Sequence, residues 1–142
     1  MNNLERAKKL LSDTDYTCVI CSDTDTRTSK QRGVAPLLSW LDHGENLCNY
    51  SAADKVVGNG AAFLYVLLNI KEVHANVISR AAYKTLLNNN ITVTYTTLTE
   101  AIRNRDNTGL CPIETAVSEI TDAQEALAAI RTKLAEIKNE KR

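Results

Sequence analysis

The spacing of apolar residues in the first third of the chain predicts a helix, a hairpin and a second helix. The first helix, from about Asn3 to Leu11, carries one apolar stripe: Leu4, Ala7, Leu10 and Leu11. Residues 16–21 are β-rich, and a polar turn joins them to a short polar strand over 26–29. The second helix begins near Pro36, because a first helical turn tolerates proline.

The most apolar stretch of the chain follows Gly60 and predicts a central helix over roughly 52–69. A helix this apolar must be buried on most sides. Ser51 and Asp54 have the spacing of a capping box at its start, and a carboxylate suits the positive end of the helix dipole. Gly58 and Gly60 would then lie inside the helix, each at a cost of about 1 kcal/mol relative to alanine. They indicate either close approach of a neighbour or a ligand, or tight packing of the helix on the sheet.

The rest of the chain alternates strands and helices. We expect strands over 72–79 and 91–98, a helix over 80–88 between them, and a last amphipathic helix over 123–138. Strands separated by helices indicate crossover connections and at least one parallel pair. The predicted fold is therefore α/β, a three-layer α/β/α sandwich with a mixed sheet of about four strands in the order 2-1-3-4.

Composition places the chain among ordinary globular proteins. Its 142 residues fit a single domain, 1–142, with a core over 1–120 and a C-terminal helix over 121–142. Seventeen basic residues balance seventeen acidic ones, so charge gives no case for nucleic acid or an anionic membrane as partner. No apolar run approaches the roughly 20 residues that span a bilayer. The N-terminus is charged and amphipathic, so we expect a cytoplasmic protein.

The cysteines do not form a recognisable metal or redox motif. Cys18 and Cys21 match CxxC, but on a strand residues three apart point to opposite faces. No second CxxC and no paired histidine completes a zinc site. We therefore interpret both as buried small side chains. His74, on an apolar strand, is interpreted as a satisfied or edge histidine.

Five short motifs together resemble a prokaryotic domain-of-unknown-function family with a cytidine-deaminase-like fold. They are ERAKKLL, Gly33-Val34-x-Pro36-Leu37-Leu38, Ala53-Asp54-Lys55-Val56-Val57-Gly58, Val77-Ile78-Ser79 and Cys111-Pro112-x-Glu114. The resemblance runs to about Val117. It implies a fold in which a hairpin precedes a buried helix, but it implies no established activity.

The zinc chemistry of the deaminase superfamily needs residues that this chain lacks. A His or Cys followed two residues later by Glu should open the central helix, and Pro-Cys-x-x-Cys the next one. Here the corresponding stretches are Ala53-Asp54-Lys55-Val56 and Ser79-Arg80-Ala81-Ala82. We expect neither zinc-dependent deamination nor any metal or cofactor.

Other polar groups remain at the crevice that the resemblance implies. Asp54, Cys111 and Glu114 are the candidate catalytic residues, with the Cys111 thiol as nucleophile, activated by a helix N-terminus and a nearby cation. Lys55 and Ser79 are candidate ligand-binding residues. In the alternative interpretation Cys111 is a small side chain before a helix, Glu114 caps that helix, and Asp54 and Lys55 face solvent.

A polar loop supplies further candidate ligand-binding residues: Arg103, Asn104 and Arg105. Guanidinium groups bind phosphate or carboxylate through planar forks, although the loop could equally be a solvated one. The leading hypothesis is a site for an unknown small anionic or nucleotide-like molecule, with the question of enzymatic activity open. The alternative is a non-catalytic regulatory module or a homo-oligomeric assembly module that uses the apolar stripe of the last helix.

Overall fold

The computed structural model describes residues 2–31, 33–103 and 111–140. The elements follow in the order α1 (Asn3–Asp13), β1 (Cys18–Cys21), β2 (Thr26–Ser29), α2 (Ala35–Asp42), β3 (Ser51–Val57), α3 (Asn59–Leu67), β4 (Glu72–Ser79), α4 (Arg80–Asn88), β5 (Thr92–Thr99), α5 (Pro112–Ala116) and α6 (Ala123–Glu140). An Asn2 capping box opens α1, with Glu5 as its second member.

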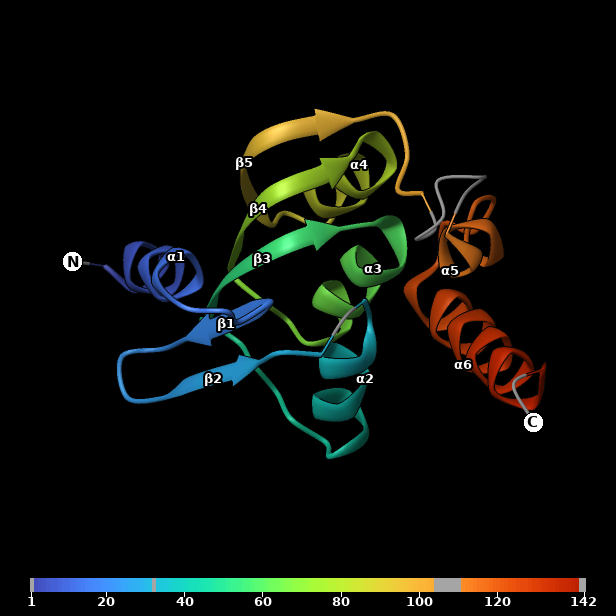
Figure 1. Ribbon diagram of the computed structural model, residues 1–142, viewed down its shortest axis with the longest axis horizontal. Helices are drawn as coiled ribbons and strands as arrows, with labels where there is room; N and C mark the ends of the chain where they lie inside the picture. The colour runs from blue at the N-terminus through green and yellow to red at the C-terminus, as the bar shows by residue number, and fades with distance from the viewer. Residues whose placement is uncertain (1, 32, 104–110, 141–142) are drawn as a thin grey trace.

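The described strands form one mixed sheet in the order β2-β1-β3-β4-β5 (Figure 1). β1 pairs antiparallel with both β2 and β3, whereas β3, β4 and β5 are parallel. This arrangement confirms the predicted hairpin and both later strands. The predicted order placed the strand over 72–79 directly beside β1, whereas β3 lies between β1 and β4. The sheet nevertheless has five strands rather than about four.

The strand that the sequence pattern did not predict is β3, whose residues were expected to form the start of the central helix. That prediction is wrong: Ser51 to Val57 is extended, and α3 begins only at Asn59, with Gly58 as its N-cap. β3 is central in the sheet and is covered on both faces, so its residues do not alternate between apolar and polar. Its small residues, Ala52 and Ala53 among them, favour a helix when read alone.

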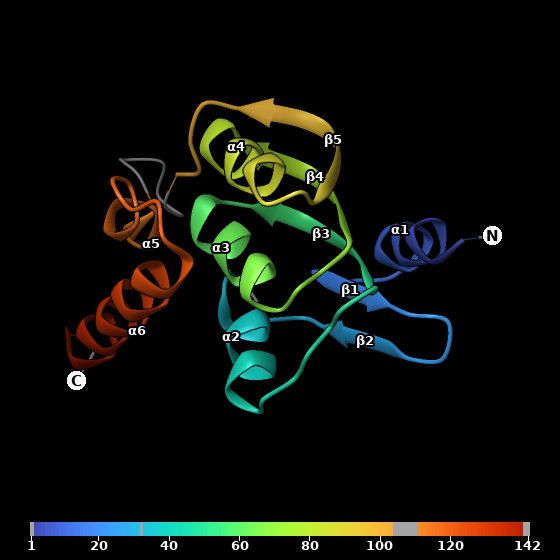
Figure 2. The same ribbon diagram turned by 180° about the vertical axis from the view of Figure 1, so that it is seen from behind.

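Helices lie on both faces of the sheet (Figures 1 and 2). α1 packs on one face, where Ala7 and Leu11 of its predicted stripe are fully or almost fully buried. α2, α3 and α4 cover the other face. Cys21 faces α1 and Cys18 faces the opposite core, which confirms that the two thiols point apart.

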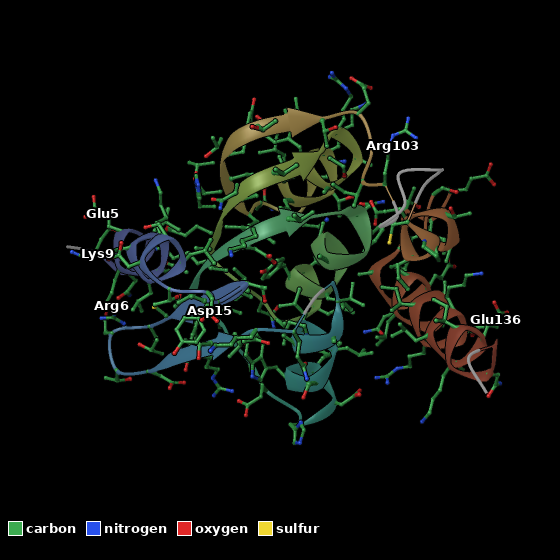
Figure 3. The ribbon with its side chains drawn as sticks, viewed as in Figure 1. Glu5, Arg6, Lys9, Asp15, Arg103 and Glu136 are labelled. Carbon is green, nitrogen blue, oxygen red and sulfur yellow. The ribbon has the colours of Figure 1, made fainter. Side chains whose placement is uncertain are left out.

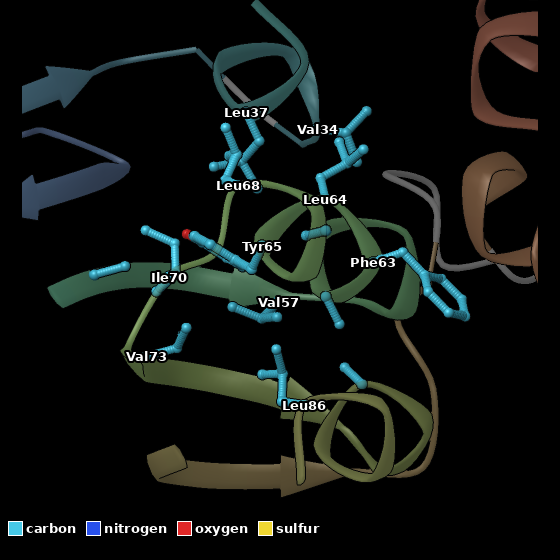
Figure 4. Close-up of a cluster of buried hydrophobic side chains, with 14 of the residues drawn as sticks. Val34, Leu37, Val57, Phe63, Leu64, Tyr65, Leu68, Ile70, Val73 and Leu86 are labelled. Carbon is cyan, nitrogen blue, oxygen red and sulfur yellow. The ribbon is translucent and has the colours of Figure 1, made fainter. Parts of the chain in front are cut away.

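The larger core surrounds α3 (Figure 4). Leu64, Tyr65 and Leu68 are fully buried there, because the sheet, α2 and α4 enclose the helix. α6 covers it from outside the sheet layer, with Ala126 and Ile130 fully buried in the same core. The apolar stripe of α6 is therefore used largely within the chain. No helix in the described part of the chain is long and apolar enough to cross a membrane.

Candidate functional site

The N-terminus of α3 holds a carboxylate from a distant part of the chain. Glu114 on α5 accepts hydrogen bonds from the backbone N–H of Asn59 at 2.7 Å and of Gly60 at 3.0 Å. These N–H groups have no partner inside the helix, and the positive end of the helix dipole favours an anion beside them. Glu114 thus caps α3, and not its own helix α5 as the alternative interpretation predicted.

The two glycines at this helix start make room for the segment that carries Glu114. A Cβ at Gly58 would lie 2.6 Å from Cδ of Glu114, and one at Gly60 would lie 2.6 Å from Cγ2 of Ile113. Both separations are shorter than carbon atoms tolerate. Close approach of a neighbour, which the sequence analysis had offered as one reason for the glycines, is therefore what the structure shows.

Polar contacts also cap α4 and join its middle to the start of α3. Ser79 ends β4, and its Oγ accepts the backbone N–H of Ala82 at 3.1 Å, which caps α4. Thr85 of α4 donates its hydroxyl to Oδ1 of the buried Asn59 at 2.6 Å. The Ser79 side chain is buried, and its oxygen accepts this backbone N–H.

Asp54 lies inside the core and not at a helix start. Tyr65 donates its hydroxyl to Oδ2 of Asp54 at 2.7 Å, and the Val56 N–H reaches Oδ1 at 3.3 Å. Burial raises the pKa of Asp54 to about 7, against the smaller opposing effect of the Tyr65 hydrogen bond. Cys18 lies 3.4 Å from the same tyrosine oxygen, and burial raises its thiol pKa well above the usual value.

The structure does not bring Asp54 together with Glu114. Asp54 lies four strand residues before Gly58, a separation of roughly 13 Å along β3. Its neighbour Lys55 is partly buried, and its backbone N–H bonds to the Thr17 carbonyl. The predicted solvent-facing position of Asp54 is therefore wrong, and so is its position at the helix start.

Cys111 and Arg103 lie near the carboxyl ends of the parallel strands. Cys111 precedes α5 as a partly buried free thiol, and its backbone N–H bonds to the Ile102 carbonyl at 3.0 Å. Arg103 is exposed beside α5 (Figure 3). Asn104 and Arg105 lie outside the described residues. Among the described residues, no three His, Cys, Asp or Glu side chains are grouped closely enough to hold a metal ion.

Sequence reasoning missed Tyr65, Asn59 and Thr85. Tyr65 was counted among the apolar residues of the central helix, although a buried phenol normally requires a hydrogen-bond partner, and that requirement is the signal that it is polar. The bond between Asn59 and Thr85 gave no local signal, because it joins two helices whose relative position depends on the sheet.

Comparison with known proteins identifies the family. The family model described as "TM1506: Domain of unknown function (DUF1893)" matches residues 6–134, which is most of the chain. The chain belongs to the DUF1893 family. A crystal structure of a DUF1893 protein from Thermotoga maritima, TM1506, is similar, with 28% sequence identity and a TM-score of 0.83. The match covers 96% of this chain and 91% of that one. No curated protein matches the chain.

The DUF1893 match includes all of the candidate site residues. Residues 6–134 extend from α1 through most of α6, so both Glu114 and the helix that it caps lie within the family domain. The similarity to TM1506 likewise covers nearly the whole chain. The contact between α5 and α3 is therefore part of the DUF1893 domain and not of an appended segment.

Proposed function

We propose that this DUF1893 domain is a non-catalytic binding module for a small anionic molecule, built on a zinc-free, three-layer cytidine-deaminase-like fold. The layer arrangement supports this, since helices cover both faces of a mixed sheet and α3 and α4 each follow a parallel strand. With α3 beginning after Gly58, the residues at the deaminase ligand positions are Gly58-Asn59-Gly60, which contain neither ligand nor glutamate. The four free thiols support a reducing, cytoplasmic location.

The observation that carries the non-catalytic proposal is the engagement of Glu114. Both of its oxygens accept backbone N–H groups of α3. Of the other candidate groups, Asp54 is bonded to Tyr65 within the core and Ser79 caps α4. Acid–base catalysis needs a carboxyl group within reach of a substrate proton. The carboxyl groups of Glu114 and Asp54 are instead bonded to groups of the protein itself. Binding through Lys55, Arg103, Asn104 and Arg105 needs no such group.

Native mass spectrometry beside the denatured mass tests this function. We expect a non-covalent added mass that Cys111→Ser retains and that Arg103→Ala reduces, because the charge of the guanidinium and not the thiol holds the anion. An adduct that survives denaturation and disappears in Cys111→Ser would instead favour thiol chemistry. A bare mass in every variant would contradict ligand binding and favour the second candidate.

The second candidate is assembly with another copy through β5, the outermost strand of the described sheet. β5 is an eight-residue edge strand without a charged residue or proline, and Tyr95 on it is 40% exposed. Proteins usually protect such edges with charges, proline or a covering segment. The self-complementary occupant is a second β5, and α6 is less suited because its stripe packs on α3.

A charged substitution on β5 distinguishes assembly through this strand from a monomeric binding module. Thr97 is exposed on β5, and Thr28 is exposed on β2 at the other edge. If β5 pairs with its copy, Thr97→Lys halves the mass measured by analytical ultracentrifugation, whereas Thr28→Lys leaves it unchanged. A monomeric mass for the unaltered chain would exclude this candidate.

A further inference from the structure

A hollow of about 370 Å³ lies between α1 and the part of the sheet face that α1 leaves uncovered. The polar residues that line it come from three elements: Lys8, Lys9 and Ser12 of α1, His74 and Asn76 of β4, and Thr96 of β5. Lys9 and Arg103 lie toward opposite ends of the longest axis of the molecule (Figure 3). The hollow is therefore distinct from the carboxyl edge of the sheet, and it is independent of the function proposed above.

A buried histidine with one unused ring nitrogen forms part of this hollow. His74 is only 7% exposed, and its Nδ1 lies 2.7 Å from the Thr94 hydroxyl on the neighbouring strand. Nε2, on the other side of the ring, has no hydrogen-bond partner among the described residues. When the Thr94 hydroxyl donates to Nδ1, Nε2 carries the proton and offers a donor to a group in the hollow.

The charged side chains that line the hollow, Lys8 and Lys9, are both positive. Both lysines are exposed, and the lysine ion pairs in the described part of the chain involve Lys30 and Lys133 instead. The described lining includes no carboxylate. Burial, and after it the nearby Lys8, lowers the pKa of His74, so the ring is neutral at pH 7 and binds by hydrogen bonding.

We propose that this hollow binds the phosphate group of a small phosphorylated molecule. Lys8 and Lys9 supply the charge, and Nε2 of His74 supplies a hydrogen-bond donor from the lining of the hollow. Asn76 and Thr96 add polar groups of the kind that orient a ligand. Ligand sites of small molecules occupy roughly 300–1,000 Å³, so the hollow leaves room beyond the phosphate itself.

Inorganic phosphate is the probe, and the two histidines of the chain make its binding visible. His43 lies at the exposed end of α2, so its ring signal serves as an internal control. We expect phosphate, added at constant pH and ionic strength, to shift the NMR signals of the His74 ring saturably and to leave those of His43 unmoved. A His43→Gln variant assigns the two sets of signals.

Charge-matched variants test whether the lysines hold the phosphate. Lys8→Met with Lys9→Met should weaken the apparent affinity about tenfold or more, a loss of about 1.4 kcal/mol or more, because it removes both positive charges of the lining. Lys84→Met with Lys138→Met removes the same charge from exposed positions on α4 and α6 and should leave the affinity unchanged. The proposal is overturned if His74 does not respond, if both histidines shift together, or if the two double variants bind alike.

Discussion

Asp54 is a carboxyl group that folding removes from water and supplies with few partners. One phenol and one backbone N–H bond to it, and burial raises its pKa to about 7 from the 3.8 of an exposed aspartate. Between these two pH values the folded chain keeps a proton that the unfolded chain has lost. The stabilisation from this proton is complete below pH 3.8 and is lost as the pH rises through about 7.

Replacing the carboxyl group with an amide should remove this pH dependence. Asp54→Asn keeps the acceptor for Tyr65 but carries no charge, so it should be more stable than the unaltered chain at pH 8 and similar at pH 4. The full difference between the two pKa values corresponds to about 4 kcal/mol. Urea unfolding of both proteins from pH 4 to 8 measures it. Parallel stability curves would show that Asp54 titrates normally.

At the scale of elements, the contact between α5 and α3 joins two parts of the chain that are 54 and 55 residues apart. Glu114 satisfies two backbone N–H groups, and Gly58 and Gly60 make its approach possible. An N-terminal cap usually comes from the residue beside the helix, but Gly58 has no side chain to provide one. The short helix α5 therefore stabilises the start of α3 from outside.

Removing the Glu114 carboxylate should destabilise the whole fold. Glu114→Ala leaves two N–H groups of α3 without an acceptor, at a cost of about 1–3 kcal/mol. Glu114→Gln, which keeps one acceptor oxygen, should lose less. Glu119→Ala is the matched control, because Glu119 is exposed on the loop after α5. Equal unfolding midpoints for the Glu114 and Glu119 variants in urea would mean that the cap contributes nothing.

Local patterns predicted most elements and failed where burial hides the pattern. The stripe of α1 and the hairpin have clear periods and were predicted correctly. β3 has no clear period of apolar residues, because helices cover both of its faces. A short run of small residues is compatible with a helix or a strand equally. The candidate site failed for a related reason: placing Asp54 at a helix start followed from the wrong assignment of β3. No local rule could place Glu114 against Asn59.

At the scale of the whole molecule, the four cysteines differ in how deeply the fold buries them. Cys18 and Cys21 are buried on opposite faces of the sheet, Cys111 is partly buried, and Cys48 is exposed. Since only an accessible thiolate reacts, the cysteines should differ in their reactivity toward an alkylating reagent.

Timed alkylation with peptide mapping should give one order. Cys48 reacts first and Cys111 more slowly, and Cys18 and Cys21 react only when urea unfolds the chain. The order follows from exposure, and burial further suppresses the Cys18 thiolate by raising its pKa. If Cys111 reacted faster than Cys48 in the folded protein, its thiol would be activated, and thiol chemistry would replace the non-catalytic proposal.

The position of Glu114 late in the chain has a consequence for synthesis on the ribosome. All five described strands, α3 and α4 are complete by Thr99, but the carboxylate that caps α3 and the α6 residues that cover its core are translated later. A nascent chain that has just finished the sheet still exposes the start of its most apolar helix. The cap of α3 and the cover of its core can therefore form only after the last quarter of the protein has left the ribosomal exit tunnel.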